Sequence, residues 1–160
     1  MITIQTYTNT KCELEMAKKR LAYLMDRKER LYCKYFPISP TLKDDIVDGS
    51  ADVSKDKMAD YVHELHEVDI GTGMSLAEEI RYQQEHVNRL QGYINDMTDT
   101  LSKMTGIEYE LYYEIIVNGL NRSQAVSKIA EKHDKDERTI WKYHYSNIKR
   151  DVSRVIFHNK

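Results

Sequence analysis

Several residue types are scarce in this 160-residue chain, and each scarcity excludes a class of protein. Only 6 Gly and 2 Pro are present, too few for an all-β fold with its many tight turns. No apolar run approaches the ~18 residues that a membrane span needs, and Met1–Thr10 is too polar for a secretory signal. Two Cys without a targeting signal fit a reducing compartment. The composition therefore favours a helical, cytoplasmic protein.

Motifs of common active sites and metal sites are also missing. The sequence contains no Walker loop, G-x-S-x-G, H-E-x-x-H or C-x-x-C. His63 and His66 form a helical H-x-x-H beside carboxylates, but no third ligand has suitable spacing. Cys12 and Cys33 lie 21 positions apart on one predicted helix, too far for a disulfide, and we expect two surface thiols. We expect no enzyme activity, no catalytic residues, no metal and no cofactor.

Charge is segregated along the chain although the net charge is only −2. Residues 1–40 carry 8 Lys/Arg and 4 Asp/Glu, a net +4. Residues 41–120 carry 6 and 17, a net −11, and residues 121–160 carry 10 and 5, a net +5. Net charge speaks to partners and association rates rather than to fold. Any nucleic-acid binding must therefore be local to the C-terminal end.

The N-terminal part reads as helices joined by an acidic linker. A first helix is predicted over about 11–35, with Thr10 and Glu13 as a capping box and two prolines after it. Residues 36–74 form the acidic linker, in which 39–53 is a predicted loop. A helix over about 55–68, capped by Ser54, is plausible within it. Its expected apolar face contains Met58, Tyr61, Val62, Leu65 and Val68.

The strongest periodicity runs over about 76–104, behind a capping box of Ser75 and Glu78. Apolar residues recur there by alternating steps of three and four, which is a heptad stripe with Gln83 as its polar member. The helix over 11–35 shows the same alternation. The two helices can pack as an antiparallel hairpin within one chain, on a second copy, or both. The stripe residues are Leu76, Ile80, Gln83, Val87, Leu90, Ile94, Met97, Leu101 and Met104.

The C-terminal region has the spacing of a helix-turn-helix, in the stretch QAVSKIAEKHDKDERTIWKY over 124–143. Thr105 and Glu108 form a third predicted capping box, and Gly119 ends the helix that it opens. Ser123 and Asp136 are the predicted caps of the next two helices. Small and apolar residues, Ala130, Ile129 and Ile140, are expected where these two helices cross.

The second helix of this motif is expected to display polar and basic side chains in its first turns. Arg138 and Lys142 lie four apart on one face, a spacing that suits guanine edges or phosphates in a major groove. Either His144 or Tyr143 turns inward with Ile140. Expected to face outward are Glu137, Arg138, Thr139, Trp141, Lys142 and Tyr145. The predicted DNA-binding residues are Ser123, Arg138, Thr139, Lys142, Tyr145, Lys149 and Arg150, with Arg154 extending the positive surface.

The stretch IAEKHDKDERTIWKYH resembles the helix-turn-helix of region four of bacterial sigma factors. The layout, including YYEIIVNGLNRSQAVSKIAE, resembles the phage late-gene transcription regulator family of the ArpU/RinA type. The sigma pattern has Leu, Gly and Val where this chain has His133, Asp134 and Lys135, and Asp takes positive φ less readily than Gly. The resemblance implies a regulator in the cytoplasm of a bacterial host, acting on double-stranded DNA.

The sequence thus predicts an all-α protein: a long helical hairpin or coiled-coil part followed by a helix-turn-helix. Residues 1–104 form the predicted dimerisation part and 105–160 the DNA-binding domain. The leading hypothesis is a homodimeric DNA-binding transcription regulator that also touches host RNA polymerase or another regulatory protein. The alternative is a protein-binding module or inhibitor that engages a basic host or phage protein, such as polymerase, a repressor or a nuclease, through the acidic helices. A third reading is a ring-forming DNA-packaging adaptor.

Overall fold

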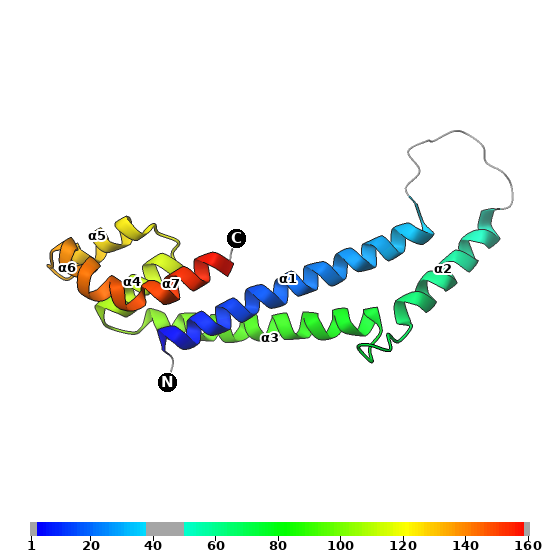
Figure 1. The fold of residues 1–160 in the computed structure, drawn as a ribbon, viewed down its shortest axis with the longest axis horizontal. Helices are drawn as coiled ribbons and strands as arrows, with labels where there is room; N and C mark the ends of the chain where they lie inside the picture. Colours follow the sequence, from blue (N-terminus) through cyan, green and yellow to red (C-terminus); the bar gives the residue numbers. More distant parts are fainter. Residues whose placement is uncertain (1–2, 38–49, 159–160) are drawn as a thin grey trace, which may run out of the picture. The chain divides into compact units, whose positions relative to one another are not determined.

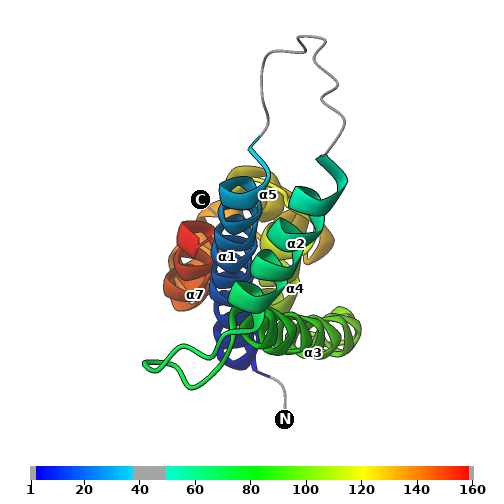
Figure 2. The same cartoon turned by 90° about the vertical axis from the view of Figure 1, so that its right-hand side faces the viewer.

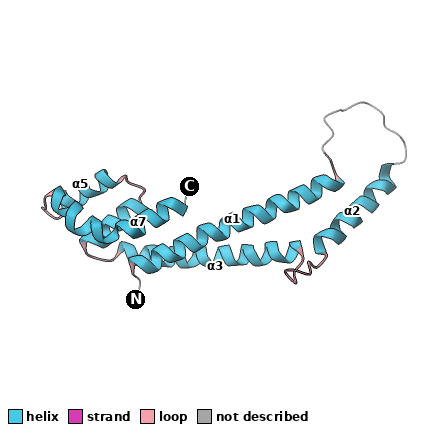
Figure 3. Cartoon of the chain, in the orientation of Figure 1, coloured by secondary structure: helices cyan, strands magenta, loops and turns pink. Residues whose placement is uncertain are grey.

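The computed structural model describes residues 3–37 and 50–158, and it is helical without strands in those residues (Figures 1 and 3). The predicted all-α fold is therefore confirmed. None of the described helices has both the length and the apolar character needed to cross a lipid bilayer. The elements in chain order are α1 (Ile4–Tyr35), α2 (Ser50–His66), α3 (Leu76–Ser102), α4 (Ile107–Ile116), α5 (Arg122–Lys132), α6 (Glu137–Thr139), the π-helical turn η1 (Ile140–Tyr145) and α7 (Ser146–His158).

The chain forms two compact units, and both long helices contribute to each of them. One unit contains residues 1–16 and 87–160, and the other contains residues 17–86. The boundary predicted at residue 104 falls in the connection between α3 and α4. We refer to these as the C-terminal unit and the central unit.

In the central unit, α1 and α3 pack as an intramolecular pair. The side-chain amide of Gln83 is 6% exposed and donates to the carbonyl of Ala17 at 3.1 Å. Gln83 thus satisfies a backbone acceptor on the opposite helix, the use expected of a lone polar residue on an apolar stripe. Among the described residues of this unit, the buried apolar side chains are Ala17, Leu24, Tyr61 and Leu76.

Helix α2 begins at Ser50, so the predicted start near residue 55 with Ser54 as its cap is wrong. The predicted loop over 39–53 lies outside the described residues up to 49, and its end belongs to α2. The predicted apolar face is wrong for most of its members, because Met58, Val62 and Val68 are exposed. Tyr61 alone among the five is fully buried.

In the C-terminal unit, residues from the start of the chain pack on α3 and α4. The hydroxyls of Tyr7 and Thr98 are hydrogen bonded at 3.0 Å. The rings of Tyr7 and Tyr112 lie edge to face, with 6.0 Å between their centres. Thr8 is hydrogen bonded to the Tyr112 hydroxyl at 2.7 Å, and both side chains are fully buried. Burial raises the pKa of Tyr112. Cys12 is 4% exposed, so the predicted surface thiol is wrong there, whereas Cys33 is exposed.

One of the three predicted capping boxes forms. The Ser75 N–H donates to the Glu78 carboxylate at 2.9 Å, and the Glu78 N–H donates back to the Ser75 hydroxyl oxygen at 3.3 Å. The bonds from the Ser75 N–H and hydroxyl lower the pKa of Glu78. The box at Thr10 is wrong, since α1 already begins at Ile4 and the Thr10 hydroxyl donates to the carbonyl of Thr6. The box at Thr105 and Glu108 is wrong as well, since Gly106 precedes α4 and no side chain caps it.

Candidate nucleic-acid interface

Helix α5 and the continuous helical segment from α6 to α7 form the predicted helix-turn-helix, beside α4 in the same unit (Figures 1 and 2). Ile129 and Ile140 are buried between the two helices, and Ala130 is 4% exposed near their crossing. Asp134, at the motif's glycine position, has φ of 47° and is the single described non-glycine residue with positive φ. Asp136 caps the second helix by accepting from the Arg138 N–H at 2.6 Å, as predicted.

The start of α5 differs from the prediction. Asn121 is its cap and accepts from the Gln124 N–H at 2.9 Å, so the predicted cap at Ser123 is wrong. Ser123 lies instead in the first turn and is exposed. Gly119, with φ of 71°, ends α4 as predicted, and the N–H of Leu120 donates to the carbonyl of Glu114 at 3.0 Å.

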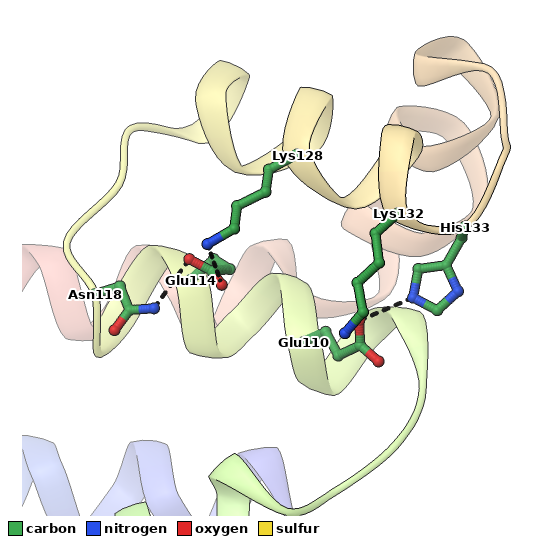
Figure 4. A network of polar contacts seen from close by, with 6 residues as sticks. All are labelled: Glu110, Glu114, Asn118, Lys128, Lys132 and His133. Atoms are coloured by element: carbon green, nitrogen blue, oxygen red, sulfur yellow. Dashed lines mark hydrogen bonds and ion pairs between the residues drawn. The ribbon is translucent and has the colours of Figure 1, made fainter.

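Two carboxylates of α4 hold α5 in place (Figure 4). Glu110 accepts from Lys132 at 2.9 Å and from His133 at 2.8 Å. Partial burial alone would raise the pKa of Glu110, but the hydrogen bonds from His133 and Lys132 outweigh it and hold this pKa below its ordinary value. Because Lys132 is already paired, its charge faces α4 and contributes little to an outer basic surface.

Glu114 makes the second contact of the same kind. It accepts from Lys128 at 2.7 Å and from the side-chain amide of Asn118 at 2.9 Å (Figure 4). Burial alone would raise the pKa of Glu114, but the hydrogen bonds from Asn118 and Lys128 outweigh it and hold this pKa below its ordinary value. Two carboxylates one turn apart on α4 thus hold the side of α5 that faces α4.

Side chains of α4 and α5 also fix the second helix of the motif. Glu108 of α4 accepts from Asn147 at 3.0 Å and lies 3.3 Å from His144. The Ser127 hydroxyl of α5 donates to Glu137 at 2.5 Å. These contacts explain why Glu108 does not serve as a capping residue, and they link the second helix of the motif to both α4 and α5.

Tyr145 is 5% exposed, so the prediction that it faces outward and donates to a phosphate is wrong. The reason is the π-helical turn over Ile140–Tyr145, which places residue 145 five positions after Ile140 on the same inner side. His144 is half-buried and Tyr143 is 57% exposed, so His144 is the more inward of that pair. The buried side of this helix is therefore Ile140, Tyr145, Ile148, Val152 and Val155.

The four predicted cationic contacts, Arg138, Lys142, Lys149 and Arg150, are all exposed. None of them forms an ion pair with another described residue. Residues 138, 142, 146 and 150 follow one another by four, which places Arg138, Lys142 and Arg150 along one side, opposite the buried residues. We call Arg138, Lys142, Lys149 and Arg150 the basic stripe.

The remaining predicted residues have mixed positions. Thr139 is half-buried, and Trp141 is half-buried with its ring 4.8 Å from that of Tyr145, so both face outward only in part. Arg154 is exposed and donates to Asn9 at 3.0 Å. Residues 138–154 hold five Lys/Arg and one Asp, whereas residues 131–137 hold two Lys and four Asp/Glu. Positive charge therefore dominates along the helix and not at the turn.

Arg122 is a surface cation that the sequence interpretation left out. It is exposed at the first position of α5, beside a surface cavity of about 600 Å³ lined by Ile115, Leu120 and Ile156 among others. The signal was present in the sequence, since Arg122 directly follows the Asn that caps the helix. The first turn of α5 thus supplies two further exposed residues, Arg122 and Ser123, besides the four residues of the basic stripe.

Comparisons of the chain with protein-family models, with curated proteins and with solved structures find no match in any of the three. Within residues 3–37 and 50–158, no group of three or more His, Cys, Asp or Glu side chains is placed to hold a metal ion.

Proposed function

We propose that this chain is a DNA-binding transcription regulator that docks its helix-turn-helix on duplex DNA. The observation that carries the proposal is the basic stripe: four exposed cations on the second helix of the motif, unpaired within the described chain. The cations of α5, by contrast, are partly neutralised by Glu110 and Glu114. Lys142 lies 5.0 Å from the ring centre of its neighbour Tyr143 but, like the other three, has no carboxylate partner among the described residues. A helix whose exposed cations are not neutralised presents a surface suited to the phosphates and base edges of a major groove.

In this proposal the first turns of the second helix enter the major groove. Arg138 and Lys142 contact guanine edges or phosphates, and Lys149 and Arg150 contact phosphates along the flank. Ser123 and Arg122, in the first turn of α5, contact a phosphate where the helix dipole is favourable. Thr139 contributes an accessible part of its side chain, and Tyr145 has a role in the core instead.

The proposed setting is that of the phage late-gene regulators of the ArpU/RinA type that the sequence resembles. The protein would act as a homodimer in the cytoplasm of a bacterial host, without enzymatic activity, and it would meet RNA polymerase or another regulatory protein at its promoter. The N-terminal helical part, residues 1–104, supplies the dimer contacts, and the helix-turn-helix of the C-terminal unit supplies the DNA contacts.

The test is binding of the full chain to a fluorescent random-sequence duplex, measured by anisotropy at increasing salt. We expect the affinity to fall steeply with salt, and Arg138→Ala and Lys142→Ala each to weaken binding about tenfold. Lys55→Ala with Lys57→Ala is the matched control, because it removes two exposed cations of α2, far along the sequence from the motif. Absent binding at low salt, or equal losses in the control, would contradict the proposal.

A second candidate function is binding of a basic protein partner through the acidic helices. Its specific support is on α2, where Met58 and Val62 are each 45% exposed and lie one turn apart on one face, while the exposed carboxylates of Asp56 and Asp60 lie on the opposite face. An exposed apolar pair on an acidic helix suits a basic amphipathic helix as partner. If the duplex does not bind even at low salt, this candidate becomes the better account of the chain.

A further inference from the structure

Helix α1 carries a second stripe of side chains beside the one that faces α3. The residues Ala22, Met25, Glu29, Tyr32 and Phe36 follow one another by three, four, three and four positions. This is the same alternation as in the first stripe, displaced by one position around the helix. A helix with two adjacent stripes of this kind presents packing surfaces for two other helices.

Helix α2 packs against only the C-terminal end of this second stripe. The ring of Tyr61 lies 5.5 Å from that of Tyr32 and 6.3 Å from that of Phe36, both edge to face. Towards the start of α1 the stripe stays open as a surface groove of about 550 Å³. Met25 is 48% exposed and Tyr32 is 45% exposed in it. The groove is lined by Ala22, Met25, Asp26, Lys28, Glu29, Tyr32 and Tyr61.

In the described part of the central unit, more large apolar side chains are exposed than are buried. Of the thirteen large hydrophobic residues exposed in the described chain, nine lie between residues 17 and 86, and only four apolar residues are buried there. A soluble monomer rarely leaves so much apolar surface in one region. The open end of the second stripe is continuous with the contact that α2 already makes, so a further helix can extend that packing.

We propose that the α1 helix of a second copy of this chain occupies the groove, antiparallel to the first. Lys28 and Glu29 are neighbours at the centre of the groove, so an antiparallel pair centred between them sets each Lys28 against the Glu29 of the other copy. The same register sets Met25 of each copy against Tyr32 of the other, since both pairs are symmetric about that centre. An interface between identical surfaces needs this self-complementarity in charge and shape.

This assignment deepens the proposed homodimer and does not depend on DNA binding. The first test is the mass of the full chain in solution, by sedimentation or light scattering. The wild type should have twice 18.9 kDa, and Met25→Glu should be a monomer at the same concentration. Met16→Glu is the matched control: Met16 is 55% exposed on the same helix, and nine positions place it on the opposite side. It should remain dimeric.

The second test is disulfide trapping in a Cys33→Ser background. Met25→Cys with Tyr32→Cys should give a covalent dimer, because the two sites are seven positions apart on one helix, about 10 Å, too far for a bond within one chain. Met16→Cys with Tyr23→Cys, exposed and also seven apart, should not. A monomeric wild type would overturn both the homodimer and this interface. A dimer that survives Met25→Glu, or traps only through the control pair, would overturn the interface while the homodimer stands.

Discussion

Asp134 holds the turn of the helix-turn-helix in a conformation that side chains with a Cβ adopt reluctantly. Its φ is 47°, in the left-handed region, where a non-glycine residue costs of order 1 kcal/mol. The chain tolerates this cost because the following N–H, of Lys135, then reaches the carbonyl of Ala130 at 2.9 Å and closes the end of α5. The turn therefore keeps the geometry of the motif without its usual glycine.

Replacing Asp134 by Gly should therefore stabilise the protein. We expect the free energy of unfolding, from urea titration followed by circular dichroism, to rise by about 0.5–1 kcal/mol. Lys135→Gly is the control, since Lys135 is not among the described residues with positive φ. There the added chain entropy should lower stability by a similar amount. A loss of stability in both variants would show that Asp134 contributes contacts that outweigh its strain.

The exposure of single residues could be predicted where the sequence spacing gave the correct side of the helix. Arg138 and Lys142 are exposed as expected because they lie within two turns of the cap at Asp136. The burial of Cys12 could not be predicted, because Cys12 lies off the apolar stripe that the sequence shows for its own helix. In the C-terminal unit that helix also meets α7, where Arg154 donates to Asn9, and burial there raises the pKa of Cys12.

At the scale of elements, local patterns predicted helices well and their ends poorly. The three predicted capping boxes share one sequence pattern, yet only that of Ser75 and Glu78 forms. Glu108 instead bonds Asn147, 39 positions away. The start of α1 moves to Ile4 because Tyr7 and Thr8 are buried against residues about 90 and 100 positions later. A pattern of four residues carries no information about such distant partners.

The π-helical turn is a second feature that local spacing did not predict. Ile140 is one end of the buried side, and Tyr145, Ile148, Val152 and Val155 continue it by steps of three and four. The step from 140 to 145 is five, one more than an α-helical turn allows, which is the mark of a one-residue insertion. The sequence did contain this signal, since the step of five from Ile140 to Tyr145 differs from the steps of three and four that follow it.

Deletion of Tyr143 should accordingly convert the π turn to an α-helical one without loss of the fold. Tyr143 is 57% exposed, and its removal brings Ile140 and Tyr145 to a spacing of four on the same side. We expect the free energy of unfolding to change by no more than about 1 kcal/mol. Deletion of Lys149, also exposed, is the control. It turns Val152 and Val155 away from the core and should cost more than about 3 kcal/mol. Equal losses would contradict the insertion.

At the scale of the whole molecule, the all-α class and the order of the long helices followed from periodicity. Which segments join into one unit did not. The grouping of residues 1–16 with 87–160 depends on contacts such as that of Thr8 with Tyr112, 104 positions apart. No periodicity within one helix specifies such a pairing. The exposure of the four cations could be predicted from the sequence because they belong to one short segment. The ion pairs between α5 and α4 appeared only in three dimensions.

The number of cations that one chain offers to DNA limits the salt dependence of binding. The basic stripe and Arg122 together hold five of them, so one copy should give a slope of log K against log salt no steeper than about −4.5. A homodimer that brings two such sets to one duplex should give a steeper slope, up to about −9.

Anisotropy titrations between about 50 and 300 mM salt, within the range where counterion release dominates, should therefore separate three variants. The wild type and Met16→Glu should share the steeper slope, and Met25→Glu should show the shallower one with weaker binding throughout. The two variants carry the same added charge on opposite sides of α1, so net charge alone cannot cause a difference between them. Equal slopes in all three would show that only one helix-turn-helix of the assembly touches the duplex, and that dimerisation through α1 serves another purpose than doubling the DNA contacts.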